Sequence, residues 1–158
     1  MNVDFIIKLL LTALGVGLFA FIDKARLGVI IVSCACGAGT FVISEILLHF
    51  YGNGFVMYFL SASFVCICAE SGARIMRVPT TVILLPAIIP LVPGSLLYGA
   101  MAALMRGDKN WYEAYGREAL NATAGIGIAI VLIAALARPV YSVGMDMVKK
   151  RKRNTIHR

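Results

Sequence analysis

The amino-acid sequence predicts an all-α integral membrane protein of about five transmembrane helices, the fourth of which is discontinuous. Three observations lead to this fold class: apolar residues make up 60% of the chain, charged residues only 15%, and four of the five prolines lie between residues 79 and 93. Soluble domains average about 45–50% apolar and about 25% charged residues. Because about 20 apolar residues cross a bilayer, the roughly 95 apolar residues here supply between four and five spans. A soluble enzyme is therefore excluded, and residues 1–158 are expected to form a single membrane domain.

The first three predicted spans are apolar runs at residues 5–22, 27–50 and 55–70. The first run resembles a secretory signal peptide, but Asp4 precedes it and no small-residue cleavage site closes it, so we expect it to be retained. The composition of residues 51–54, Tyr-Gly-Asn-Gly, predicts a turn between the second and third spans. These runs account for three membrane crossings.

The fourth predicted span, residues 79–105, contains Pro79, Pro86, Pro90 and Pro93. A proline inside a helix removes a backbone hydrogen bond and clashes with the preceding turn, so a continuous helix is not expected. The segment either crosses once as a broken helix or forms a re-entrant hairpin, because irregular backbone is tolerated at membrane depth only within protein or beside water. A loop, residues 106–118, then leads to a fifth span, residues 119–140, and a basic tail, residues 141–158.

The positions of lysine and arginine predict the topology. Six of the fifteen basic residues are Lys149, Lys150, Arg151, Lys152, Arg153 and Arg158. A basic tail after a hydrophobic segment is typical of a cytoplasmic end near anionic lipid headgroups. We therefore expect five crossings of the plasma (inner) membrane, with the N-terminus outside and the C-terminus in the cytoplasm. The net charge of +7 does not indicate nucleic-acid binding, because no basic face with interleaved aromatic residues is present.

Four pairs of small residues spaced four apart are expected at contacts between helices: Ala13/Gly17, Ser33/Gly37, Ala35/Gly39 and Gly125/Ala129. Such pairs let helix backbones approach closely in a membrane. The four cysteines form two Cys-x-Cys pairs inside apolar runs. Residues two apart point to nearly opposite faces of a helix, so we expect these cysteines to pack as small apolar side chains.

Motifs of several enzyme classes are missing from the sequence. It has no His-Glu-x-x-His zinc motif, no Gly-x-Ser-x-Gly nucleophile motif and no nucleotide-binding loop. Gly15, Gly17 and Ala20 match the dinucleotide fingerprint Gly-x-Gly-x-x-Ala, but that fingerprint needs a preceding strand, which is not predicted. We therefore expect no catalytic residue, no metal and no cofactor.

The broken fourth segment supplies the candidate substrate-binding residues, which are Pro90, Pro93, Gly94, Ser95 and Tyr98, together with Asn121 of the fifth span. Secondary carriers often bind an anionic group near the midplane, at the N-terminal amides of a half-helix. Here Gly94 tolerates unusual backbone dihedrals, and Ser95 is expected to cap a new half-helix. Tyr98 and Asn121 can hydrogen-bond either a substrate or a neighbouring helix. The alternative is that the prolines only kink a packed helix.

Two ionisable pairs are candidates for coupling or gating, because charged groups inside a membrane are rare and often functional. Glu45 and His49 are four apart near the outer end of the second span. Such a pair can carry a proton near neutral pH, or it can be an interfacial ion pair. Glu70 and Arg74 are four apart at the inner end of the third span. They can gate transport, or they can form an ordinary cytoplasmic ion pair.

Part of the sequence resembles the signature of the threonine/serine exporter family. The residues that carry this resemblance are Pro86-Ala87-Ile88-Ile89-Pro90-Leu91-Val92-Pro93-Gly94-Ser95, Leu96-Leu97-Tyr98 and Met101, with Ala69-Glu70, Ala73-Arg74 and Arg77-Val78-Pro79 upstream. A carrier of this family consists of two hydrophobic halves, fused or separate. In length, span number and motif position, the chain is similar to the separate C-terminal half, which is the small subunit.

The resemblance implies one subunit of a secondary exporter that moves small carboxylated metabolites of the threonine/serine type out of the cell, driven by the proton gradient. Its expected partner is a second hydrophobic subunit, with a homo-oligomer as the fallback. Separate small subunits of this kind are also linked to succinate export. A dicarboxylate exporter subunit and a non-transporting membrane assembly subunit are therefore the alternatives.

Overall fold

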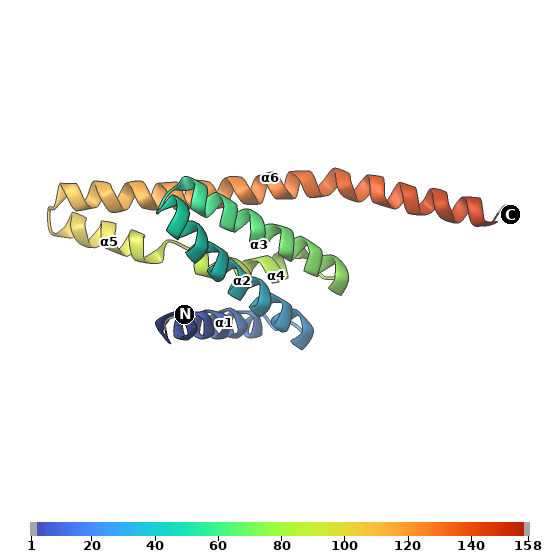
Figure 1. The fold of residues 1–158 in the computed structure, drawn as a ribbon, viewed down its shortest axis with the longest axis horizontal. Coiled ribbons are helices and arrows are strands. Elements are labelled where there is room, and N and C mark those ends of the chain that lie inside the picture. The colour runs from blue at the N-terminus through green and yellow to red at the C-terminus, as the bar shows by residue number, and fades with distance from the viewer. Residues whose placement is uncertain (1–2, 157–158) are drawn as a thin grey trace.

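The computed structural model describes the backbone of residues 3–156 and the side chains of residues 3–137. Within this range the chain forms α1 (Val3–Ile22), α2 (Leu27–Tyr51), α3 (Phe55–Met76), α4 (Thr80–Ile88), a short 3-10 helix η1 (Ile89–Leu91), α5 (Gly94–Met105) and α6 (Lys109–Ile156) (Figure 1). By length and composition, α1, α2, α3 and residues Lys109–Ala137 of α6 can each cross a membrane, and the bent pair α4–α5 can supply a fifth span. The predicted all-α fold with about five apolar helical segments able to span a membrane is thus confirmed, and the proline-rich segment is broken as expected.

The last helix begins earlier than the sequence predicts. Residues 106–118 were expected to form a loop because they are polar, but α6 is helical from Lys109. The Asp108 Oδ1 atom accepts a hydrogen bond from the backbone N–H of Trp111 at 3.4 Å, a contact typical of a residue that caps a helix N-terminus. The connection between α5 and α6 is therefore very short. The expected basic tail, residues 141–158, lies outside the residues whose side chains are described.

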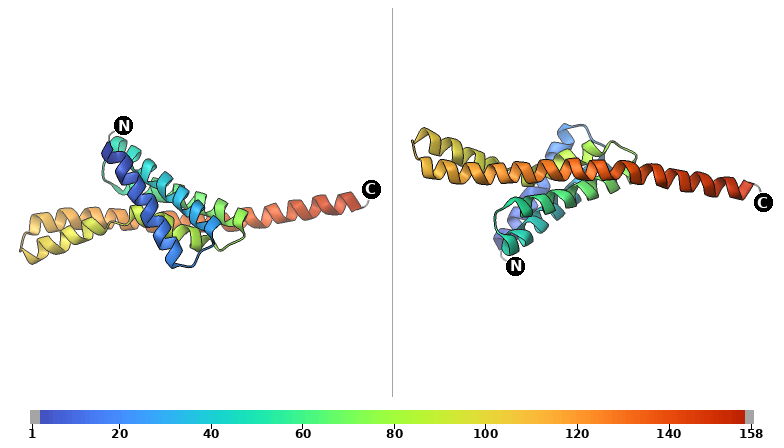
Figure 2. Two further views of the ribbon diagram at one scale, coloured as in Figure 1. Left: turned by 90° about the horizontal axis from the view of Figure 1, so that it is seen from below. Right: turned by 90° about the horizontal axis from the view of Figure 1, so that it is seen from above.

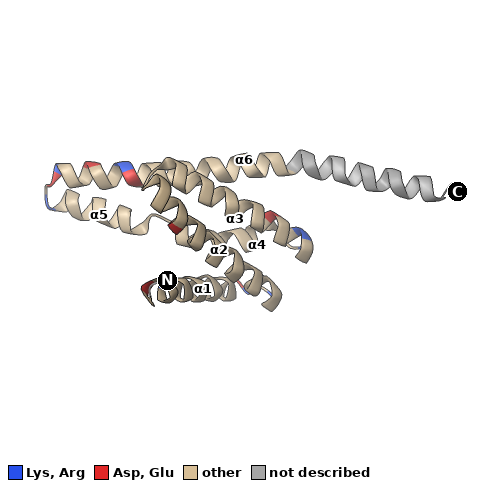
Figure 3. Cartoon of the chain, in the orientation of Figure 1, with Lys and Arg blue, Asp and Glu red and all other residues tan. Residues whose placement is uncertain are grey.

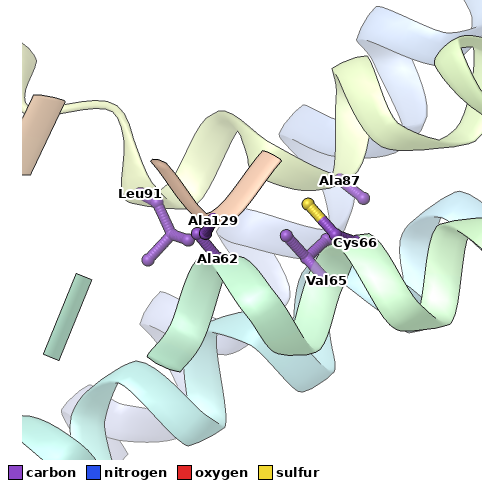
Figure 4. Packing of buried hydrophobic residues seen from close by; sticks show 6 residues of the cluster. All are labelled: Ala62, Val65, Cys66, Ala87, Leu91 and Ala129. Atoms are coloured by element: carbon purple, nitrogen blue, oxygen red, sulfur yellow. The ribbon is translucent and has the colours of Figure 1, made fainter. Parts of the chain in front are cut away.

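The central helix of the bundle is α3, which packs against α2, α4 and α6; the two views in Figure 2 show α2 and α3 crossing α6 obliquely. Its buried face consists mostly of small residues at helical spacing: Ser61, Ala62, Val65, Cys66, Ala69, Gly72 and Ala73. One cluster joins Ala62, Val65 and Cys66 to Ala87 of α4, Leu91 of η1 and Ala129 of α6 (Figure 4). Small side chains let the backbones approach closely, which favours van der Waals packing where lipid supplies no hydrophobic driving force.

Glycines mark the closest contacts between helices. A Cβ atom placed on Gly125 of α6 would lie 2.9 Å from the carbonyl oxygen of Phe55, at the start of α3. A Cβ atom on Gly37 of α2 would lie 2.7 Å from a methyl group of Val16 in α1. Three of the four predicted small-residue pairs therefore lie at interfaces, namely Ala13/Gly17, Ser33/Gly37 and Gly125/Ala129. In the fourth pair the prediction is wrong for Ala35, which is exposed.

We predict that Gly125→Ala destabilises the fold by about 1–3 kcal/mol, because the added methyl group meets backbone atoms that cannot move aside. Gly127→Ala is the matched control, since nothing lies within 4 Å of a Cβ at that position, and it should be neutral or stabilise by up to about 1 kcal/mol. The measurement is the free energy of unfolding of the full chain in detergent. Equal stabilities for the two variants would show that α3 and α6 do not approach as closely as described.

Candidate functional site

The proline-rich segment bends sharply between α4 and α5. The part from Thr80 to Leu91 and the part from Gly94 to Met105 meet at an angle of 50°. Pro86 lies inside α4, Pro90 lies in the first turn of η1, and Pro93 occupies the N-cap position of α5. Each proline removes one backbone donor, so the regular helix cannot continue through the segment.

Two details predicted for the start of α5 are wrong. Ser95 does not cap the helix: α5 begins at Gly94, Pro93 takes the N-cap position, and no side chain caps the end. Gly94 has no left-handed backbone conformation, because the only described glycines with positive φ are Gly52 and Gly107. A Cβ atom on Gly94 would also meet nothing within 4 Å. The special role expected for this glycine's backbone freedom is therefore not supported.

The first-turn amides of α5 are nevertheless open to a ligand. The N–H of Gly94 donates to the carbonyl oxygen of Val92 at 2.8 Å, and the N–H of Leu97 donates to that of Pro93 at 3.0 Å. Among the described residues, the N–H groups of Ser95 and Leu96 have no acceptor. Ser95 is exposed. Such unpaired amides carry the positive end of the helix dipole and favour an anionic group.

Beside this helix end, α5 and α6 form an antiparallel hairpin with a cavity of about 490 Å³ between them. The polar and aromatic residues that line the cavity are Ser95, Tyr98, Arg106, Asp108, Trp111 and Tyr115. The rings of Trp111 and Tyr115 stack with centroids 5.6 Å apart. The structure thus brings two predicted residues, Ser95 and Tyr98, to one cavity. Pro90, Pro93, Gly94 and Asn121 do not line it.

The hairpin lies beyond the end of the α2–α3 pair (Figure 1). Gly99 of α5 packs against Tyr115 of α6, whereas the start of α3 packs against a later part of α6, through Phe55 and Gly125. Leu91, just before the break, clusters with Ala62 in the first third of α3. The break therefore lies near the N-terminal end of α3 and not halfway along that helix.

A second group of predicted residues lies where α3 meets α4. The Arg74 Nη2 atom lies 3.5 Å from Glu70 Oε2, and the hydroxyl group of Thr80 donates to Glu70 Oε1 at 3.1 Å. The predicted pairing of Glu70 with Arg74 is thus formed. Because Thr80 is the first residue of α4, Glu70 connects the last turns of α3 to the first turn of α4.

A polar cavity of about 310 Å³, which we call the corner cavity, opens at this junction. Its polar lining comes from Glu70, Arg74, Arg77 and Thr80. Arg77 ends α3 in the left-handed conformation, at φ 56° and ψ 43°, and its N–H donates to the carbonyl oxygen of Ala73. Figure 3 shows the acidic and basic residues at this end of α3.

Sequence reasoning missed Arg77 and Thr80 as members of this group. The end of α3 was predicted at residue 70, whereas the helix continues to Met76. Pro79 is a signal that a helix ends one or two residues earlier. Had this signal been used, the end of α3 would have been predicted near Arg77, which places Arg77 close to Arg74. No comparable signal distinguishes Thr80 from other threonines.

The remaining predicted pair, Glu45 and His49, is not joined by a direct contact among the described residues. Glu45 and His49 lie on the same face of α2, where Glu45 is half-buried and His49 is exposed. Among the described residues, no hydrogen bond or ion pair joins them. The His49 ring instead contacts the edge of Phe50 at a centroid distance of 5.8 Å. Neither residue lines the hairpin cavity or the corner cavity.

Comparison with known proteins gives one family match. The family model described as "Threonine/Serine exporter, ThrE" matches residues 7–136. This range contains both cavities and all the candidate site residues. No curated protein and no solved structure matches the chain.

Proposed function

Because the chain belongs to the threonine/serine exporter family, we propose that it is one subunit of a secondary exporter that moves a small carboxylated metabolite, of the threonine/serine type, out of the cell. The family and the apolar helices make it a multi-pass membrane protein of a transporter class. The observation that carries the proposal beyond the family is the broken segment, where unpaired amides of α5 adjoin a cavity.

In the proposed orientation the chain lies in the plasma (inner) membrane with the N-terminus outside and the C-terminus in the cytoplasm. Gly28 at the start of α2 lies against Met76 at the end of α3, so the links before α2 and after α3 are on one side of the bundle. These links contain Lys24, Arg26 and Arg77. Loops rich in lysine and arginine favour the cytoplasmic side, which supports this orientation.

A second hydrophobic subunit is the proposed partner, and the α5–α6 hairpin is the surface that supports it. The exposed apolar residues of α5 are Leu97, Tyr98, Met101, Leu104 and Met105, the last 88% exposed. Beside them, the first part of α6 carries exposed charges at Lys109, Glu113 and Arg117 (Figure 3). These charges on α6 disfavour burial of the hairpin in the hydrocarbon of the bilayer. We therefore propose that protein, and not lipid, covers the exposed apolar residues of α5. A second copy of this chain is the alternative cover.

In the proposed mechanism the unpaired amides of Ser95 and Leu96 hold the substrate carboxylate, and Tyr98 adds a hydrogen bond from the same cavity. Glu70, which joins α3 to α4, is the proposed gating or coupling group together with Arg74. A proton that neutralises Glu70 would weaken its contacts to Arg74 and Thr80, which ties the position of α4 to the proton gradient. Glu45 and His49 are a second candidate for carrying the proton.

The exporter proposal is tested by counterflow in proteoliposomes that contain this chain with the second hydrophobic subunit, or this chain alone. The labelled substrates are threonine, serine and succinate. We predict saturable flux of threonine and serine with both subunits and no flux with this chain alone. Flux from this chain alone would contradict the need for a partner. No flux of any substrate from the pair would contradict the exporter function, and flux of succinate only would favour the dicarboxylate alternative.

The role of the α5 amides is tested by Ser95→Pro, which removes one unpaired N–H. Proline is tolerated in the first turn of a helix, and the preceding Gly94 has no Cβ to clash with the ring. Loss of a hydrogen bond to a charged group costs about 1.5–3 kcal/mol, so the substrate should bind at least about tenfold more weakly. Ser95→Ala keeps the amide and serves as the control, with a smaller expected effect. Equal affinities of the two variants would place the carboxylate elsewhere.

A further inference from the structure

The corner cavity contains both signs of charge at the junction of α3 and α4. Glu70 and Arg74 line it together, and their closest charged atoms are 3.5 Å apart. Strong charge-assisted hydrogen bonds between nitrogen and oxygen measure about 2.7–2.9 Å. The Glu70 side chain remains 25% exposed and that of Arg74 37% exposed. A ligand that supplies its own charged groups can therefore reach both residues.

Arg77 contributes a further cation to the same cavity. Among the described residues, no carboxylate lies within ion-pair distance of its guanidinium group. Its left-handed backbone is unfavourable for a non-glycine residue, and the N–H groups of both Arg77 and Val78 donate to the carbonyl oxygen of Ala73, which fixes the turn. Glycine usually occupies this position at a helix end. Lys24 and Arg77 are the described non-glycine residues with positive φ, and of the two only Arg77 lines the corner cavity.

We propose that the corner cavity is the loading site, which selects the substrate by charge before the amides of α5 hold it: Arg77 takes the carboxylate of a small zwitterion, and Glu70 takes its ammonium group. The single carboxylate of a zwitterion matches the charge of the Arg77 side chain. The second carboxylate of a dicarboxylate would face Glu70, and two like charges repel each other strongly when partly desolvated. Glu70 is therefore the residue that favours an amino acid over a dicarboxylate.

The site is consistent in size and position with this role. Its volume of about 310 Å³ is at the lower end of the range of ligand cavities, about 300–1,000 Å³, which suits a small metabolite with some water. It lies on the side that the proposed orientation assigns to the cytoplasm, where an exporter loads its substrate. The inference rests on the proposed function for this direction of transport. An ammonium group on Glu70 would also compete with Thr80, so loading the site would loosen the contact between α3 and α4.

The test is equilibrium binding of labelled L-threonine and labelled succinate to the full chain in lipid nanodiscs. All the residues that line the cavity belong to this chain, so no partner is required. The key variant is Arg77→Gly, which removes the guanidinium group while relieving the left-handed backbone. Arg77→Gln and Glu70→Gln complete the set. Arg26→Gln removes an exposed arginine from the link on the same side and is the matched control.

We expect the wild-type chain to bind threonine in preference to succinate. Arg77→Gly should keep or raise the unfolding temperature of the chain. Arg77→Gly and Arg77→Gln should nevertheless both bind threonine about tenfold more weakly than the wild type. Glu70→Gln should shift the preference towards succinate by about tenfold. The Arg26→Gln control should change neither affinity more than about twofold. The inference is overturned if the wild-type chain shows no saturable threonine binding, if it prefers succinate, or if the cavity variants bind as the control does.

Failure of this inference can be told from failure of the proposed function. Threonine flux by the two-subunit complex that is unchanged by Arg77→Gly would overturn the corner cavity as the selecting site and leave the exporter function standing. Threonine binding that depends on Arg77, without flux from the complex, would support the site and contradict the exporter function.

Discussion

The small side chains along α3 let α2, α4 and α6 approach its backbone, and the positions of both candidate sites follow from that close packing. Lipid is as apolar as the side chains themselves, so helices in a membrane associate through van der Waals contact at short range. Ala69 and Ala73 hold Ile83 of α4 against α3. This contact places Thr80 within hydrogen-bond distance of Glu70. A bulky residue in place of either alanine would separate the two helices and open the corner cavity.

The two cavities lie at opposite ends of one segment, α4 with η1. Thr80, the first residue of α4, lines the corner cavity, and Ser95, just after the break, lines the hairpin cavity. Between them α4 and η1 are packed into the bundle through Ala87 and Leu91. We expect a displacement of α4 that begins at Glu70 to reach the amides of α5. In the proposed exporter, substrate selection at one end and carboxylate binding at the other would then be coupled through the same helix.

Composition and proline spacing were sufficient to predict the apolar helices and the break, because hydropathy and the missing proline N–H act locally, but not the end of α3 at Met76 or the start of α6 at Lys109. The contacts that depend on packing could not be read in this way. Ser95 was expected to cap α5, but Pro93 takes that position one residue earlier. Glu70 and Arg74 were found by their spacing within one helix, whereas Thr80 joins them only through the fold. The position of the α5–α6 hairpin beyond the end of the α2–α3 pair follows from the contact of Gly99 with Tyr115, which no local sequence pattern specifies.

We expect the break to divide a membrane-embedded part, α4 with η1, from the α5–α6 hairpin, which leaves the bundle. The most direct measurement is labelling by a membrane-impermeant maleimide in spheroplasts, with the four native cysteines replaced by alanine and one cysteine introduced in α6. Glu113→Cys lies in the hairpin, and Ile128→Cys lies at the level of the bundle, next to buried Ala129. We expect Glu113→Cys to react from the outside and Ile128→Cys to react only after detergent is added. Protection of both positions, or reaction of Glu113→Cys from the cytoplasmic side alone, would contradict this expectation.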